Sequence, residues 1–419
     1  MKIKLSLSVL LLTFSSTVLL AQNVTNSPYS LYGYGELSDP AFGAQKAMGG
    51  IGYGLREGNI INPLNPASFS RVDSMTFMFD AAITAKRSWF DDGINTSQNT
   101  NAKLDYIAMQ FPLAKNLGMG LGFKPITQVG YKFGKTYPDS IMTNTGSGGL
   151  NQFYGALSYN FKNLSVGVNA GYLFGNIYHQ QNVTFNNSAP FPAMKSDTLS
   201  ASGLILNFGL QYTRLFGKDQ RIVLGAVYTP KLSINGKFSG AEFSYNSSGV
   251  IQGWTPRPPR GEGYELPETY AVGFSYAKGE RFLGGIDCSY QRWSDVKFEG
   301  ETGQFNDRTK INIGGEYTPN IRSRAYFKRV HYRLGGNFAN SYVSPIAAFD
   351  GKPYPFNEYS VSCGFGFPLI DKRSAVNLAF EYTKIRPNEN VVGLVREQYL
   401  RLTVSYTFNE LWFFQRKVQ

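Results

Sequence analysis

Cysteine and histidine are scarce in this sequence, with two of each among 419 residues. Cys288 and Cys363 fall on the apolar faces of predicted strands that are three apart, too distant for a disulfide bond. We interpret His331 as a polar residue lining a lumen, and His179 has no candidate nucleophile near it in sequence. No zinc cluster, calcium loop or phosphate loop is present. The sequence therefore predicts no enzyme, no metal and no cofactor.

Long hydrophobic runs are also absent after the first 21 residues, and none reaches the ~18 residues that a membrane helix needs. The N-terminus is the exception, because Lys2 and Lys4 precede an apolar run over residues 5–20. This pattern predicts a signal peptide over residues 1–21, cleaved before Gln22. An uncleaved anchor is the alternative, and no cysteine follows that would carry a lipid.

Aromatic residues, in contrast, are abundant: 32 Phe, 27 Tyr and 4 Trp. Many lie at the ends of segments in which apolar and polar residues alternate. In residues 398–408, Leu400, Leu402 and Val404 fall on one face, whereas Arg401 and Thr403 fall on the other. A period of two is typical of a β-strand with one apolar face. We predict fourteen such strands, over residues 74–87, 101–113, 117–136, 149–161, 164–178, 198–216, 220–235, 265–278, 281–297, 307–319, 329–343, 354–368, 374–386 and 396–408.

The connections between these strands alternate between short turns and long polar loops, the longest over residues 236–264. That rhythm is typical of an antiparallel barrel that crosses a membrane repeatedly, with turns on one side and loops on the other. A soluble β-sandwich or propeller is the alternative, but no repeat of propeller period is visible. We therefore predict an all-β fold, a 14-stranded antiparallel transmembrane β-barrel over residues 74–408, followed by a periplasmic tail over residues 409–419.

Residues 22–73 do not alternate and are rich in glycine and proline. A barrel of fourteen strands leaves a lumen that another segment can fill. We expect residues 22–73 to form a hatch in that lumen, with a disordered periplasmic tail as the alternative. The third strand contains Pro125, which cannot donate to a strand ladder and follows Gly118, Gly120 and Gly122 on one face. Pro125 therefore predicts an opening in the wall, unless it only kinks the barrel rim.

The formal net charge of +12 includes basic clusters over residues 257–260, 322–329 and 416–417. In an outer membrane, we expect anionic lipid headgroups rather than nucleic acid as their partner, or simply solvated turns. A receptor driven by TonB would need ~22 strands and a large plug domain, for which 419 residues are too few.

Three features resemble the FadL family of outer-membrane transporters for long-chain fatty acids and aromatic hydrocarbons. Asn65-Pro66-Ala67 follows a glycine-rich run and precedes the first strand, as in the hatch of that family. Leu266-Pro267-Glu268 and the strand ending in Trp293-Ser294 resemble a second family motif. The fourteen strands and the break in the third strand also agree, so the resemblance covers most of the mature chain.

The resemblance implies passage of small hydrophobic molecules through a hatch-gated barrel with lateral release into the membrane. It implies that Asn65, Pro66 and Ala67 belong to the hatch and that Pro125 marks the wall opening. The long loops depart from the family, because they are polar and lack its apolar helical pair. A non-transporting partner in protein secretion or envelope assembly therefore remains an alternative function.

Overall fold

The computed structural model describes residues 27–186, 192–217, 219–246, 248, 250–346, 350–371, 373–389 and 394–412. The predicted signal peptide, Arg416 and Lys417 lie outside these residues. No helix in the described ranges is long and apolar enough to cross a membrane.

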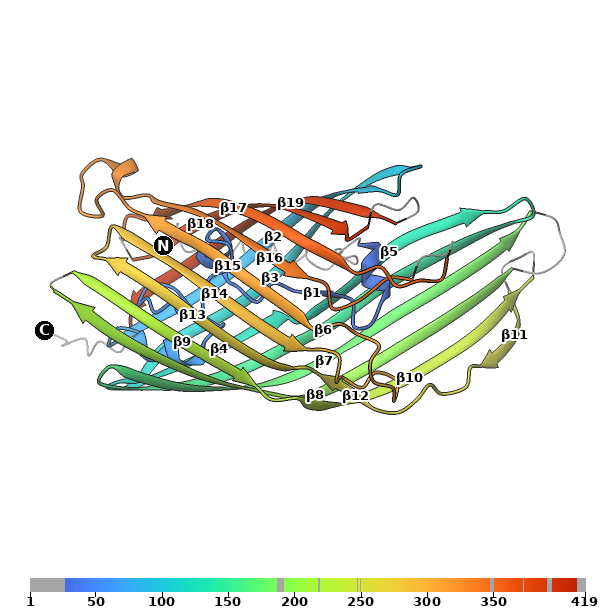
Figure 1. Cartoon of the computed structure of the whole chain (residues 1–419), viewed down its shortest axis with the longest axis horizontal. Coiled ribbons are helices and arrows are strands. Elements are labelled where there is room, and N and C mark those ends of the chain that lie inside the picture. Colours follow the sequence, from blue (N-terminus) through green and yellow to red (C-terminus); the bar gives the residue numbers. More distant parts are fainter. Residues whose placement is uncertain are drawn as a thin grey trace, which may run out of the picture.

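The wall of the molecule is one antiparallel sheet that closes on itself (Figure 1). Its strands are β2 (Thr76–Asp91), β3 (Thr96–Ala114), β4 (Leu117–Pro125), β5 (Thr127–Thr136), β6 (Ser140–Phe161), β7 (Leu164–Phe185), β8 (Ala193–Phe216), β9 (Gln220–Thr229), β10 (Leu232–Tyr245), β11 (Ile251–Pro256), β12 (Tyr264–Leu266), β13 (Glu268–Lys278), β14 (Phe282–Arg292), β15 (Arg308–Tyr317), β16 (His331–Asn340), β17 (Phe356–Pro368), β18 (Ala375–Pro387) and β19 (Arg396–Leu411).

Three positions in the wall hold two strand segments each. β4 and β5 both pair with β6, β9 and β10 both pair with β8, and β12 and β13 follow one another across Pro267. The last strand, β19, pairs with the first, β2, which closes the ring. The predicted transmembrane barrel of fourteen strands is therefore confirmed. β19 ends at Leu411, inside the range predicted as a tail.

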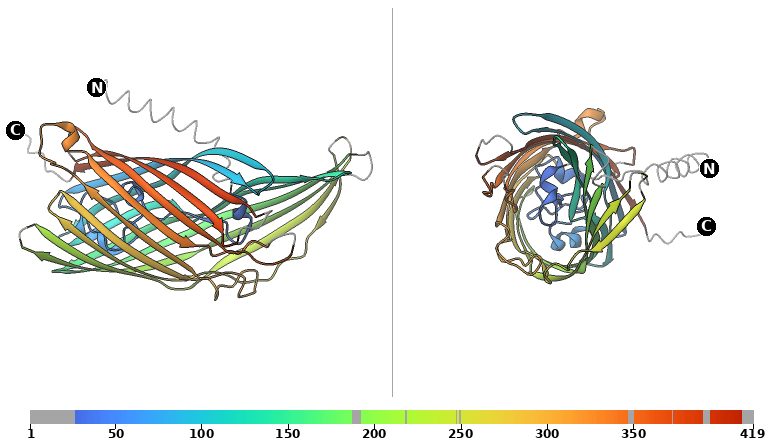
Figure 2. Two further views of the ribbon diagram at one scale, coloured as in Figure 1. Left: turned by 45° about the horizontal axis from the view of Figure 1, so that its top comes forward. Right: turned by 90° about the vertical axis from the view of Figure 1, so that its right-hand side faces the viewer.

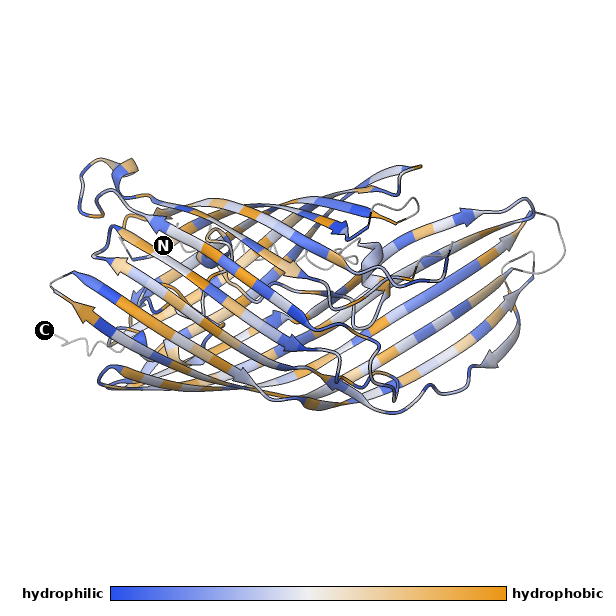
Figure 3. Cartoon of the chain, viewed as in Figure 1, coloured by the Kyte–Doolittle hydropathy of each residue, from blue (hydrophilic) through white to orange (hydrophobic). Residues whose placement is uncertain are grey.

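The two faces of the wall differ in polarity as the alternation predicts, and Figure 3 shows the change of colour along the strands. In β19, Thr403 and Ser405 are buried inside the barrel, whereas Val404 and Tyr406 are exposed on the outside. This arrangement presents apolar side chains to lipid and polar side chains to the lumen. Cys363 is exposed, Cys288 is half-buried, and both are free thiols, as predicted.

Several strands continue well beyond the predicted ends, at the end of the barrel opposite the short turns (Figure 1). Residues 96–100 and 236–245, predicted as loop, belong to β3 and β10, and His179 lies in β7 rather than in a loop. The backbone ladder needs no apolar face, so it continues where both faces of a strand meet water. Alternation fades there, and sequence patterning places the strand ends too early.

The segment before the barrel, residues 27–73, lies inside the ring, as the end-on view in Figure 2 shows. We call this segment the plug. It contains η1 (Pro28–Leu31), β1 (Glu36–Leu37), α2 (Gly43–Lys46) and η2 (Pro66–Arg71). Its apolar side chains are buried against the wall, including Ala47, Met48, Ile51, Ile61 and Phe69. Whether the plug moves as a hatch stays a prediction.

Candidate functional site

The wall is interrupted between β3 and β5. The ladder between β3 and β4 ends at the pair formed by Ile107 and Phe123. Beyond that pair, β5 is bonded on one side to β6 and on the other only to the two residues of β1. β3 and β5 diverge there, as Figure 1 shows. We call the space between residues 96–106 of β3 and 127–136 of β5 the wall gap.

Both strands contribute to this interruption. Pro125 ends β4, and its ring nitrogen has no hydrogen to donate toward β3. On β3, the register with β2 shifts so that Tyr106 pairs with Ala82 and Leu104 with Ile83, which leaves Asp105 as a bulge. The Asp105 carboxylate instead forms a buried ion pair with Lys46 of the plug. The bulge at Asp105 is thus a second feature of this interruption, which sequence reading missed, and an opening at Pro125 stays a prediction.

β1 of the plug pairs with β5 beside the wall gap, and we call this contact the seal. Leu37 pairs with Thr127, and Glu36 pairs with Gln128. The Glu36 carboxylate lies 3.2 Å from Lys86 Nζ, and the same ammonium lies 3.2 Å from the buried Glu397 carboxylate. The seal is therefore a short β-ladder reinforced by charges.

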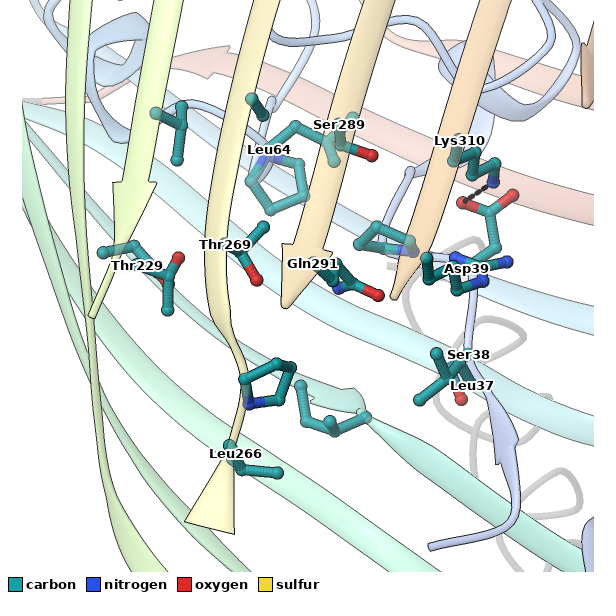
Figure 4. A pocket seen from close by; sticks show the side chains of 18 of the residues that line it. Leu37, Ser38, Asp39, Leu64, Thr229, Leu266, Thr269, Ser289, Gln291 and Lys310 are labelled. Atoms are coloured by element: carbon teal, nitrogen blue, oxygen red, sulfur yellow. Dashed lines mark hydrogen bonds and ion pairs between the residues drawn. The ribbon is translucent and has the colours of Figure 1, made fainter. Parts of the chain in front are cut away.

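A cavity of about 210 Å³ lies in the lumen on the inner side of β1. We call it the lumen cavity, and Figure 4 shows part of its lining. Its apolar lining includes Leu37, Leu64, Ile126, Ile205, Val227, Leu266 and Trp293, and its polar lining includes Asp39, Lys124, Gln152, Asn207, Thr229, Thr269, Ser289, Gln291, Arg308 and Lys310. Apolar and polar side chains therefore share the lining of this cavity, as is common in ligand pockets.

Positive charge dominates this lining. Lys310 Nζ lies 3.9 Å from the Asp39 carboxylate, the contact drawn in Figure 4. Burial alone would raise the pKa of Asp39, but Lys310 and Lys46 outweigh it and lower that pKa to about 2. Lys124 is also buried, and its ammonium lies 5.7 Å from the centre of the Tyr154 ring. Asp39 is therefore the one carboxylate in this lining, beside the basic groups Lys124, Arg308 and Lys310.

The predicted hatch residues are placed next to this cavity. Pro63 and Leu64, which line it, immediately precede Asn65. The Asn65 amide donates to Tyr53 O at 2.9 Å and to Leu210 O at 3.1 Å, and its oxygen accepts from Ala67 N at 3.0 Å. Asn65 thereby caps η2 and ties it to β8.

Pro66 and Ala67 pack against a part of the wall where glycine leaves no side chain. A Cβ at Gly167 of β7 would lie 2.4 Å from the Pro66 carbonyl carbon, so only glycine permits this approach. On β4, a Cβ at Gly120 would lie 2.2 Å from the Phe69 ring. Gly118 and Gly120 therefore make room for Phe69 of the plug, whereas Gly122 makes room for Tyr154 of β6, and their spacing alone does not reveal these roles.

A single carboxylate fastens the plug to the far side of the wall. Asp287 of β14 accepts hydrogen bonds from the backbone N–H groups of Gly52 at 2.5 Å, Tyr53 at 2.8 Å and Gly54 at 3.4 Å. Asp287 is the one carboxylate on a strand whose outward side chains are apolar, and this was the available sequence signal. Nothing in the sequence, however, indicates the partner, because the two regions are 235 residues apart.

Both histidines of the wall make structural contacts. His331 and Arg333 both contact the Glu316 carboxylate across the lumen face, at 2.8 and 2.7 Å. The lumen position predicted for His331 is thus observed. His179 Nδ1 lies 2.6 Å from the Tyr131 hydroxyl. Within the described residues, no group of three or more His, Cys, Asp or Glu side chains is arranged to hold a metal ion.

A family model described as BamG matches residues 2–419, so the chain belongs to the BamG family. No curated protein sequence compared with the chain matches it.

Solved structures with a similar fold include the toluene transporter TodX of Pseudomonas putida, at 15% identity and a TM-score of 0.57, over 90% of this chain and 100% of that one. A FadL homologue of Pseudomonas aeruginosa has 13% identity and a TM-score of 0.55, over 89% and 99%. The Ralstonia pickettii toluene transporter TbuX has 14% identity and a TM-score of 0.53, over 88% and 98%. The predicted resemblance to the FadL family is therefore confirmed for the fold.

Proposed function

We propose that this member of the BamG family resides in the outer membrane and lets small hydrophobic molecules, of the fatty acid or aromatic hydrocarbon class, pass through its barrel. In this proposal the plug acts as the hatch. A molecule in the lumen cavity leaves sideways through the wall gap into the membrane when β1 moves away from β5.

The position of β1 carries the proposal. Leu37 lines the lumen cavity, whereas Glu36, its neighbour, lines a small space in the wall gap together with Lys103 and Gln128. Two residues therefore separate a ligand-sized cavity from the break in the wall. Because β1 is held by one short ladder, it is the smallest part of the plug whose movement would join the two spaces. The solved relatives that are named as toluene transporters add support.

The test is a disulfide bond between β1 and β5 that locks this ladder. Leu37→Cys and Thr127→Cys place two thiols on directly opposite residues, within reach of a disulfide bond. Cys288 and Cys363 are replaced by alanine to prevent other pairings. Uptake of a labelled long-chain fatty acid or alkylbenzene is then measured in cells, with a deletion strain as the baseline. We expect uptake to fall to that baseline when the pair is oxidised and to recover on reduction.

A matched control joins two wall strands away from the gap. Leu378→Cys with Val404→Cys connects β18 to β19 on the outer face and leaves the plug free. Uptake that is equally impaired in this control would show that the loss comes from oxidation and not from locking β1. Uptake that persists in the locked variant would contradict exit through the wall gap.

A second candidate function is a non-transporting partner in protein secretion or envelope assembly. It is favoured by the polar character of the seal, in which Lys86 holds Glu36 and Glu397, and Asp287 holds the backbone of residues 52–54. A closure built from charges is costly to open into lipid. The locked variant separates the two functions, because an assembly partner needs no plug movement. Two results together would favour this second function. The oxidised locked variant would fully restore outer-membrane integrity in the deletion strain, and the wild type would take up no hydrophobic probe.

A further inference from the structure

The connection between β15 and β16, residues 318–330, is the exception among the short turns. It protrudes sideways from its end of the barrel, where Figures 1 and 2 show it in orange with the short helix η3 (Tyr326–Lys328). Its backbone is ordered by internal hydrogen bonds, from Asn320 N to Lys328 O at 2.8 Å and from Arg329 N to Tyr326 O at 2.8 Å. We call it the basic loop.

Charge in the basic loop has one sign. Its ionisable side chains other than tyrosine are Arg322, Arg324, Lys328 and Arg329, and it contains no Asp or Glu. None of these four groups forms an ion pair within the described part of the chain. The cluster at residues 257–260 differs, because Arg257 and Arg260 both contact the Asp197 carboxylate. Of the two basic clusters within the described residues, the basic loop is thus the one whose cations have no carboxylate partner.

Two hydrogen bonds fix the loop against the outer face of the wall. The Tyr332 hydroxyl donates to Phe327 O at 3.0 Å, and the Tyr326 hydroxyl donates to Pro368 O at 3.2 Å. Tyr332 lies on the face of β16 opposite the lumen residues His331 and Arg333. The loop is therefore folded outward, toward lipid, and not over the mouth of the barrel.

Exposed apolar side chains accompany these charges. Phe327 is 75% exposed, and Ile370, in the neighbouring short turn, is 99% exposed. An aromatic ring beside several basic groups at the edge of the apolar band is the arrangement by which proteins engage a bilayer interface, with rings at the acyl boundary and cations at the headgroups.

We propose that the basic loop binds the headgroups of anionic phospholipids in the leaflet at the short-turn end of the barrel. Arg322, Arg324 and Lys328 would contact the phosphates, and Phe327 would lie at the headgroup boundary. The inference does not depend on whether the barrel transports a ligand, because the loop is outside the lumen. The basic loop has positive charges without carboxylate partners and is folded outward from the wall. These two features favour an anionic lipid surface over an acidic protein as its partner.

The experiment measures how deeply Phe327 of the basic loop lies in the bilayer. The full mature chain, with Cys288→Ala and Cys363→Ala, carries a nitroxide on Phe327→Cys and is reconstituted into phosphatidylcholine vesicles with or without phosphatidylglycerol. Accessibility to oxygen, which partitions into lipid, is compared with accessibility to an aqueous nickel chelate. A nitroxide on Asn163→Cys, in the short turn between β6 and β7, is the matched control. We expect the Phe327 label to be protected from nickel, more strongly with phosphatidylglycerol, and the Asn163 label to show no such dependence on lipid charge.

A charge variant tests the headgroup contacts. Arg322→Gln, Arg324→Gln and Lys328→Gln are combined, and Arg329 is retained because its guanidinium lies 5.2 Å from the centre of the Tyr326 ring. Each cation near an anionic surface strengthens binding severalfold, so retention of phosphatidylglycerol over phosphatidylcholine should fall on the order of tenfold or more. Heat-modified mobility on a gel verifies that the barrel is folded.

Two outcomes would overturn the proposal. The first is equal nickel accessibility of the two labels in both kinds of vesicle. The second is protection of the Phe327 label in native membranes but not in either kind of vesicle, which would assign the basic loop to an acidic protein partner.

Discussion

At the scale of single residues, Asp287 is a direct contact between the wall and the plug. Its side chain replaces water for three consecutive backbone N–H groups of the plug, which would otherwise be buried without partners. Hydrogen bonds to a charged acceptor contribute more than neutral ones, and their loss leaves unsatisfied donors. The carboxylate therefore links the wall directly to the conformation of residues 52–54.

We expect Asp287→Ala to weaken docking of the plug by about 2–3 kcal/mol. In planar lipid bilayers, this variant should show open-channel events on the order of thirtyfold more often than the wild type. Asp371→Ala is the control, since Asp371 accepts from Arg373 N and Ser374 N in a short turn and does not contact the plug. Unchanged conductance of the Asp287 variant would mean that other contacts suffice to hold the plug.

Single residues also differ in how well the sequence predicts their part in the candidate site. Asn65, Pro66, Ala67 and Pro125 were predicted from local motif and backbone chemistry. Asn65 follows Leu64 of the cavity lining and Pro125 ends β4 beside the wall gap, while the roles of all four stay predictions. Asp287, Lys46 and Asp105 act through partners far away in the chain, so their local sequence contains no sign of the contact. Charged residues on a lumen face are expected in any barrel with a polar interior, and only the folded ring shows which of them meet.

At the scale of elements, the third wall strand is divided into β4 and β5 by Pro125, while β3 carries a bulge at the opposite position. We expect Pro125→Val to supply the missing N–H and to extend the ladder toward β3, which would narrow the wall gap. Uptake of hydrophobic compounds should then fall severalfold, and heat-modified mobility should stay that of a folded barrel. Pro368→Val, at the end of β17 and away from the gap, should leave uptake unchanged.

Strand existence was predicted well because lipid on one side and a polar lumen on the other impose a period of two. Strand ends were predicted poorly where that contrast disappears. Residues 96–101 are polar on both faces and still continue β3, since the pairing with β2 runs from Asn101 to Thr96 without interruption. The length of a strand in its water-exposed part is set by backbone pairing, which the amino-acid composition of that part does not encode.

At the scale of the whole molecule, the arrangement of turns and long strands predicts the orientation in the membrane. Short turns face the periplasm in barrels of this kind, so the long β10–β11 hairpin should be extracellular. An epitope tag between Tyr245 and Ile251 should be labelled on intact cells, and a tag at the C-terminus should be labelled only after permeabilisation. Surface labelling of the C-terminal tag on intact cells would reverse the orientation.

The position of the plug also has a consequence for biogenesis. Its contacts span the whole ring: the Ser27 hydroxyl donates to Glu397 of β19 at 2.6 Å, Lys46 pairs with Asp105 of β3, and residues 52–54 contact β14. The plug, which precedes the wall strands in the sequence, therefore completes its contacts only when the last strand, β19, is in place. We therefore expect insertion of the barrel and enclosure of the plug to occur together, completed by the pairing of β19 with β2.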